Sequence, residues 1–168
     1  MTLREQWIQK FGEAYQLFGL PKLMGNIVGL LLASSEPLSL DDITSQLGVS
    51  KGPVSQVMGR LRDHQLVERI NVPGNRKDFY RAVDDIFGHA FANHTELFRR
   101  NLILAQFFHM AIQDDPNAVI VAPHREQDRV AFTGRVQEME EFYSLMMKHM
   151  DAFLTEWAER KNANSNAA

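Results

Sequence analysis

The chain has 168 residues, of which 45% are hydrophobic, so it is long enough to bury one substantial core and is predicted to be globular. It contains no cysteine, which excludes disulfides, thiolate nucleophiles, Cys-based zinc sites and iron–sulfur clusters. The net charge of -3 hides an asymmetry, because residues 50–81 hold seven basic and three acidic side chains whereas the other residues hold 11 basic and 18 acidic ones. Unless this is a chance fluctuation of surface charge, such a basic island suits binding of a polyanion through one face.

No segment has the length and apolar character of a membrane span. The most apolar stretch, from Ile27 to Ala33, is too short to cross a bilayer and contains Gly29. The first residues, Met1 to Glu5, carry charge but are not followed by an apolar segment with a small-residue cleavage site. We therefore expect a cytoplasmic protein with no membrane partner.

Two helices are predicted in the first third of the chain. An amphipathic helix over residues 1–18 is indicated by apolar side chains at a spacing of four, namely Leu3, Trp7, Phe11, Tyr15 and Phe18. After Pro21, a second helix reaching Leu32 is apolar on nearly every side, which is typical of a helix at the centre of a fold. A short extended piece, Leu38 to Leu40, then leads to Ser39 or Asp41 as the N-cap of the next helix.

Residues 40–62 have the spacing of a helix-turn-helix. Leu40, Ile43 and Leu47 form one apolar stripe, and Gly48 ends that helix because glycine readily adopts a left-handed backbone conformation. Ser50 is a favourable N-cap for a second helix, whose apolar face consists of Val54, Met58 and Leu61. Pro53 falls at the third helical position, where its missing N–H costs no helical hydrogen bond. The other faces of this helix are polar, small or basic: Lys51, Ser55, Gln56, Gly59, Arg60 and Arg62.

A β-hairpin is predicted directly after these two helices. Two strand-like segments, 67–72 and 78–83, flank Pro73-Gly74-Asn75, which is a strong turn sequence. Arg76 and Lys77 make the tip of this hairpin basic. A basic hairpin beside a helix-turn-helix is the wing of a winged helix.

The rest of the chain is predicted to be mainly helical. A helix over residues 86–112 is followed by a connection of undetermined form at 117–128. The last helix shows an alternating spacing of four and three apolar residues, which is the a/d pattern of helices packed side by side. This seam consists of Phe132, Val136, Met139, Tyr143, Met146, Met150, Phe153 and Trp157. Residues 161–168 are predicted to be a disordered tail.

The stretch from about Phe18 to Ala82 resembles the GbsR-type branch of the MarR-like winged helix-turn-helix transcription regulators. The resemblance covers roughly two fifths of the chain and depends on the order and spacing of several short segments: 19–21, 30–32, 36–41, 47–52, 54–55, Leu61, 66–69 and 72–80. It implies a homodimeric transcription regulator, in some members connected with choline or glycine betaine metabolism. Pro53 inside the recognition helix departs from the family pattern.

Duplex DNA is the expected partner, because an α-helix fits the major groove, where base edges present distinguishable donors and acceptors. Lys51 suits a guanine edge and Gln56 an adenine edge, although either side chain can bind phosphate instead. Arg76 and Lys77 are expected to contact the DNA backbone or the minor groove. The predicted DNA-binding residues are Ser50, Lys51, Gly52, Pro53, Ser55, Gln56, Arg60, Arg76 and Lys77.

A homodimer is expected because two recognition helices related by two-fold symmetry read half-sites about one helical turn apart, which predicts a palindromic operator. The predicted dimer surface combines the seam with Trp7, Phe11 and Tyr15 of the first helix. The alternative is that the seam packs inside one protomer. The fold class is therefore mainly α, with a winged helix-turn-helix domain and a small β-hairpin wing at 19–83, flanked by dimerisation helices at 1–18 and 84–160.

No pattern in the sequence suggests an enzyme, a cofactor or a metal site. No Ser-His-Asp signature, P-loop or glycine-rich dinucleotide loop is present, and His89, His94, His109, His124 and His149 lack ligand spacing. The many aromatic residues of the outer helices either form ordinary core or build a cage for a quaternary ammonium effector. The main hypothesis is a DNA-binding regulator that acts as a repressor and responds to a small-molecule effector, and the alternative is a winged helix that docks another protein.

Overall fold

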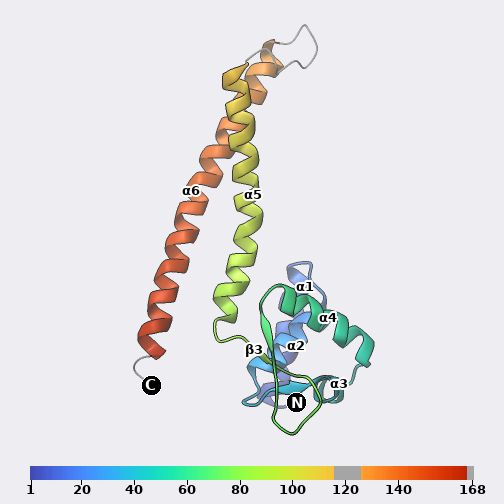
Figure 1. Ribbon diagram of the computed structural model, residues 1–168. Helices are drawn as coiled ribbons and strands as arrows, with labels where there is room; N and C mark the ends of the chain where they lie inside the picture. Colours follow the sequence, from blue (N-terminus) through green and yellow to red (C-terminus); the bar gives the residue numbers. More distant parts are fainter. Residues whose placement is uncertain (116–125, 166–168) are drawn as a thin grey trace. The chain divides into compact units, whose positions relative to one another are not determined.

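The computed structural model describes residues 1–115 and 126–165. The chain divides into two compact units, Met1–Ala90 and Phe91–Ala168. In Figure 1 the first unit contains α1 to α4 and the small sheet, and the second contains most of α5 together with α6. The predicted connection at 117–128 lies largely outside the described residues, as do His124 and residues 166–168 of the predicted tail.

The first unit is a winged helix. Its elements are, in chain order, α1 (Leu3–Leu17), α2 (Lys22–Leu32), β1 (Leu38–Ser39), α3 (Leu40–Leu47), α4 (Lys51–Asp63), β2 (Val67–Ile70) and β3 (Phe79–Ala82). The three strands form an antiparallel sheet in the order β1-β3-β2, and β2 and β3 are the two strands of the wing. The predicted fold class, mainly helical with a small hairpin wing, is confirmed.

The core of this unit surrounds α2, as expected for a helix that is apolar on nearly every side. Ile27 and Leu30 of α2 have no exposed surface, and the same holds for Ile43 of α3 and for Val54 and Leu61 of α4. The apolar faces read from the spacing in α3 and α4 are therefore the faces that meet α2 and one another. Val57 of α4 is also buried, although it was not included in the apolar face predicted for this helix.

Local backbone chemistry fixes where α3 and α4 begin and end. Ser39, not Asp41, is the N-cap of α3, and it forms a reciprocal capping box with Asp42. Gly48 ends α3 with φ 64°, the left-handed conformation predicted for it. The end of α4 was not foreseen: Gln65 adopts φ 57° after the C-cap residue His64, and this turn leads into β2.

Helix α1 approaches α2 very closely. Trp7 Nε1 donates a hydrogen bond of 3.0 Å to the carbonyl oxygen of Gly29. Phe11 and Tyr15 are partly buried against the core of the same unit. These three residues were predicted to form part of the dimer surface. In the structure Phe11 and Tyr15 pack against the core of their own unit, whereas Trp7 hydrogen-bonds to α2 and stays 44% exposed. Their role in dimerisation stays a prediction.

The second unit is a helical hairpin. Helix α5 (Ile86–Asp114) begins in the first unit, where Ile86 is buried, and α6 (Glu126–Ser165) runs antiparallel to it (Figure 1). Helix α6 continues five residues past the end expected at 160, so residues 161–165 are helical. None of the helices in the two described ranges has the length and apolar composition needed to span a membrane.

The seam of α6 makes contacts with α5 of the same chain. Tyr143 accepts a hydrogen bond of 3.0 Å from Asn101 Nδ2, and its ring stacks on Phe98 with 6.2 Å between centroids. The Phe153 ring lies 4.9 Å from the Phe91 ring. At these positions the seam packs inside one protomer, which was the alternative considered for it.

Candidate DNA-binding surface

One side of α4 is held by the core and the other is open to solvent. Val54, Val57, Met58 and Leu61 are buried, which fixes the rotation of the helix about its axis. The residues predicted to contact DNA from this helix and its N-cap are all exposed: Ser50, Lys51, Gly52, Pro53, Ser55, Gln56 and Arg60. The arrangement presents polar and basic side chains on an exposed helix face, as insertion into a groove requires.

The start of α4 has free hydrogen-bonding groups. Ser50 occupies the predicted N-cap position, but its side chain makes no capping hydrogen bond. Pro53 at the third helical position removes one of the two usual donors to an N-cap side chain, because that role belongs to the N–H of N2 or N3 and proline at N3 has none. The Ser50 hydroxyl and the first N–H groups of α4 therefore lack intrahelical partners. Gly52 adds no side chain that would keep a ligand away from this end.

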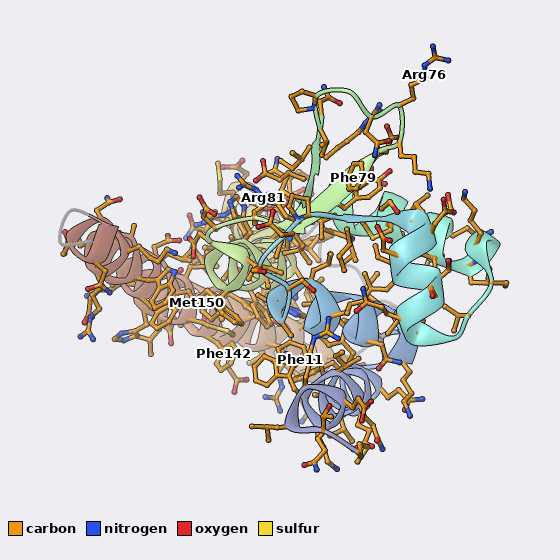
Figure 2. All side chains as sticks on the ribbon, turned by 90° about the horizontal axis from the view of Figure 1, so that it is seen from below. Phe11, Arg76, Phe79, Arg81, Phe142 and Met150 are labelled. Atoms are coloured by element: carbon orange, nitrogen blue, oxygen red, sulfur yellow. The ribbon has the colours of Figure 1, made fainter. Side chains whose placement is uncertain are left out.

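The wing presents a basic tip on a braced hairpin. Gly74 with φ 80° makes the turn, and Asn75 Oδ1 accepts a hydrogen bond of 3.0 Å from the backbone N–H of Lys77. Ion pairs hold the strands below the tip: Arg69 with Asp78 at 2.5 Å and Arg81 with Glu68 at 2.7 Å. Figure 2 shows the Arg76 side chain extending away from the hairpin. Within residues 1–115 and 126–165, no acidic side chain forms an ion pair with Arg76.

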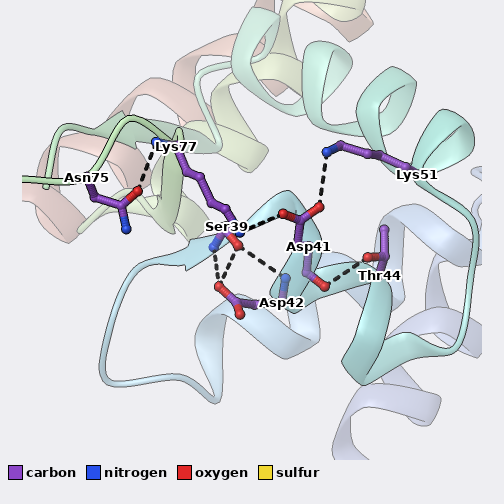
Figure 3. A network of polar contacts seen from close by, with 7 residues as sticks. All are labelled: Ser39, Asp41, Asp42, Thr44, Lys51, Asn75 and Lys77. Atoms are coloured by element: carbon purple, nitrogen blue, oxygen red, sulfur yellow. Dashed lines mark hydrogen bonds and ion pairs between the residues drawn. The ribbon is translucent and has the colours of Figure 1, made fainter.

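The wing and α4 are connected through one carboxylate of α3 (Figure 3). Asp41 Oδ1 lies 3.0 Å from Lys51 Nζ, and Asp41 Oδ2 lies 2.8 Å from Lys77 Nζ. The hydrogen bonds from Lys77 and then from Lys51 lower the pKa of Asp41 to about 2, and the carboxylate in turn raises the pKa of Lys77. Asp41 is therefore ionised at neutral pH and both lysines are ion-paired in the free protein.

The second unit carries an apolar groove of about 410 Å³ that is formed by one face of α6 and by Phe91 of α5. Its lining residues are Phe91, Phe142, Leu145, Met146, His149, Met150 and Phe153. Three of them belong to the predicted seam, whereas Phe142, Leu145 and His149 flank it. In the part of the chain that the structure describes, no three His, Asp or Glu side chains gather as metal ligands would.

The predicted DNA-binding residues thus lie on two neighbouring elements of the first unit, at the start and outer face of α4 and at the tip of the wing. Sequence reasoning missed Asp41, which was considered only as an N-cap. The sequence gives no signal for its role, because residues 41, 51 and 77 are brought together only by the tertiary fold.

Comparisons with known proteins identify two similar bacterial proteins. The HTH-type transcriptional repressor OpcR of Bacillus subtilis (strain 168) is 24% identical over 156 residues, 90% of this chain and 84% of that protein. The HTH-type transcriptional regulator YvaV of the same organism is 29% identical over 91 residues, 52% of this chain and 51% of that protein. No protein-family model matches the chain.

A crystal structure of a transcriptional regulator has the same fold, with a TM-score of 0.70 and 20% sequence identity over 93% of this chain and 98% of that chain. The relatives of this chain are therefore HTH-type transcriptional regulators, and not enzymes.

Proposed function

We propose that this protein is a sequence-specific, double-stranded DNA-binding transcription regulator that acts as a homodimer and represses its targets. The observation that carries the proposal is the exposed polar and basic face of α4 beside the basic tip of the wing. Repression is supported by the relative OpcR, which is described as a repressor. The proposal places α4 in the major groove and the wing against the adjacent backbone or minor groove.

Base reading falls to the exposed side chains at the start of α4. Gln56 can make a bidentate contact to adenine, and Lys51 can donate to the N7 and O6 acceptors of guanine. Gly52 and Pro53 have no polar side chains and let the helix end approach the DNA closely. Arg76 at the wing tip supplies a cation for the phosphates or the narrow minor groove.

The homodimer is supported by exposed apolar residues on the second unit. A single winged helix bound by charge alone has a Kd on the order of 10⁻⁴ to 10⁻⁶ M, so a tight regulator needs two. In the α5–α6 hairpin the following side chains are at least 59% exposed: Leu97, Ile103, Phe107, Met110, Val130, Phe142 and Leu145. We propose that this surface, together with the outer edges of the seam, pairs two copies and that the operator is palindromic.

The test begins with selection of bound fragments from random duplex DNA, followed by a footprint. Affinity for the selected duplex is expected to fall steeply with salt, and Lys51→Met is expected to weaken it about 5- to 150-fold if Lys51 contacts a base. Arg76→Met is expected to weaken all duplexes alike and to reduce the salt slope by about 1. Fluorescence anisotropy with salt titration measures both effects.

Lys10→Met is the matched control, because Lys10 lies on α1 and pairs with Glu13 outside the proposed surface. It is expected to leave DNA affinity unchanged. If neither salt nor the substitutions of Lys51 and Arg76 changed binding, the protein-docking winged helix would be favoured instead.

We also propose a small-molecule effector of the choline or betaine type, bound in the groove of α6. Because Phe142 and Leu145 belong both to this groove and to the surface proposed to pair two copies, the effector would lie at the edge of the dimer interface. The support is the presence of three benzyl rings, Phe91, Phe142 and Phe153, in one apolar groove, since ring faces attract quaternary ammonium ions. A ligand at about 100 times its Kd would stabilise the protein by about 2.7 kcal/mol, which a thermal-shift screen detects as an increase of several degrees in Tm.

Phe153→Leu is expected to abolish that shift because it removes a ring while retaining an apolar side chain, whereas Ser144→Ala, at an exposed position of α6 outside the groove lining, is expected to preserve it. An absence of any change in Tm or in DNA affinity with choline, betaine and related cations would remove the effector from the proposal.

A further inference from the structure

Asp41 is the only carboxylate in Figure 3 that faces the two lysines of the proposed DNA surface. One of its oxygens is 3.0 Å from Lys51 Nζ at the start of α4, and the other is 2.8 Å from Lys77 Nζ on the wing. Asp42, the next residue, accepts hydrogen bonds from the N–H and hydroxyl of Ser39 in the capping box. The neighbouring carboxylate is thus committed to the helix end, and Asp41 alone of this pair joins three elements.

An acidic residue at this place works against non-specific binding. Contacts to phosphates dominate non-specific affinity, and a fixed negative charge between two cations repels any phosphate that approaches them. A random sequence does not place an acceptor in the direction in which the ion pair holds each lysine, so to reach a phosphate the lysine must leave the carboxylate and turn toward the backbone. In the protein without DNA, each oxygen of the Asp41 carboxylate pairs with one of these lysines. Two ion pairs therefore have to be broken before both lysines can bind phosphates.

Binding to the correct sequence does not require the same exchange. A lysine ammonium has three N–H donors, and a hydrogen bond to Asp41 uses one of them. The other two N–H donors of Lys51 remain available, and they can bind a guanine edge that lies in the direction in which the ion pair holds the side chain. The same carboxylate holds the wing tip near the start of α4, so that a duplex has to fit both elements at once.

From this geometry we propose that Asp41 is a specificity-determining residue: its carboxylate positions Lys51 and Lys77 for the operator and lowers affinity for all other DNA. The inference rests on the proposed DNA-binding function. The depressed pKa of Asp41 agrees with it, because the group keeps its charge throughout the range in which DNA binding is measured.

The test compares wild type and Asp41→Asn by fluorescence anisotropy on two duplexes, a random sequence and the selected operator. Asp41→Asn is expected to bind the random duplex about 3- to 10-fold more tightly and the operator no more tightly than wild type, which lowers the specificity ratio at least threefold. The salt slope on the random duplex is expected to steepen by about 1 as a further phosphate contact forms.

Two further variants separate positioning from bulk charge. Glu13→Gln removes the same charge from an exposed pair with Lys10 on α1 and is expected to leave the specificity ratio unchanged. In a Lys51→Met, Lys77→Met background, the Asp41→Asn substitution is expected to lose its effect on the random duplex, because Asp41 then has no lysine to hold. Circular dichroism checks that each variant is folded.

Equal changes on both duplexes, no change at all, or an effect that persists without the two lysines would each overturn the role of Asp41 while leaving the proposed function intact. If wild type bound neither duplex in a salt-dependent way, the proposed function would fail and the inference with it.

Discussion

Replacing Gly25 by alanine is expected to destabilise the first unit by about 3 kcal/mol, at the upper end of the usual cost of overpacking. A Cβ at Gly25 would lie 2.4 Å from the carbonyl oxygen of Phe11 and 2.8 Å from the Cα atom of Gly12. Both are backbone atoms of α1, so the clash is relieved only by moving that helix away from α2. Movement of α1 would also strain the hydrogen bond from Trp7 to Gly29.

Thermal and urea unfolding measure the effect, which corresponds to a decrease in Tm of more than about 10 °C for a unit of this size. The matched control is Gly59→Ala in α4, where an added Cβ has nothing within 4 Å. This control is expected to raise stability by as much as about 1 kcal/mol, since alanine is the better helix former. An unchanged melting temperature for Gly25→Ala would contradict the close approach of α1 and α2.

The winged helix was predictable because each of its parts has a local signal. Gly48 ends α3 in the left-handed conformation that glycine adopts easily. Val54, Met58 and Leu61 repeat at the helical period and are buried. The turn at Gly74 similarly locates the wing. Each signal depends on residues that are close together in the sequence, so it can be recognised without knowledge of the tertiary structure.

The contact between α1 and α2 could not be read in the same way. A glycine within a helical pattern indicates either a weak point or a close approach, and the spacing does not distinguish them. The aromatic stripe of α1 was therefore predicted to face a second copy, whereas Gly25 and Gly29 allow it to pack on α2. Periodicity identifies which face of a helix is buried but not what covers it.

The same limit applies to the candidate site and to α6. The exposed face of α4 could be predicted from the helical spacing of its apolar residues, because the face opposite the buried one is left to the solvent. The ion pairs of Asp41 join residues far apart in the sequence, and no pattern predicts them. In α6, the alternation of four and three predicted a contact face but not its partner, and at Tyr143 and Phe153 that face contacts α5 of the same chain.

A dimer therefore needs an apolar surface other than the inner seam, and Phe142 and Leu145 offer one because they are 59% and 60% exposed on α6. Substituting both by glutamate is expected to convert the protein to a monomer at micromolar concentration. An unpaired carboxylate buried in an apolar interface costs several kcal/mol, and here two such groups meet two more from the partner copy. Sedimentation or light scattering measures the change in mass.

Operator affinity is expected to fall by about 10²- to 10⁴-fold in the same variant, because the second half-site is no longer bound at high effective concentration. Affinity of each winged helix for random DNA should change little. Ser144→Glu with Thr155→Glu adds the same charge at exposed polar positions of α6 and is expected to remain dimeric. If the Phe142 and Leu145 variant also remained dimeric, the interface would lie elsewhere, and the exposed part of Trp7 on α1 would be the next surface to test, because its ring is still 44% exposed after packing on α2.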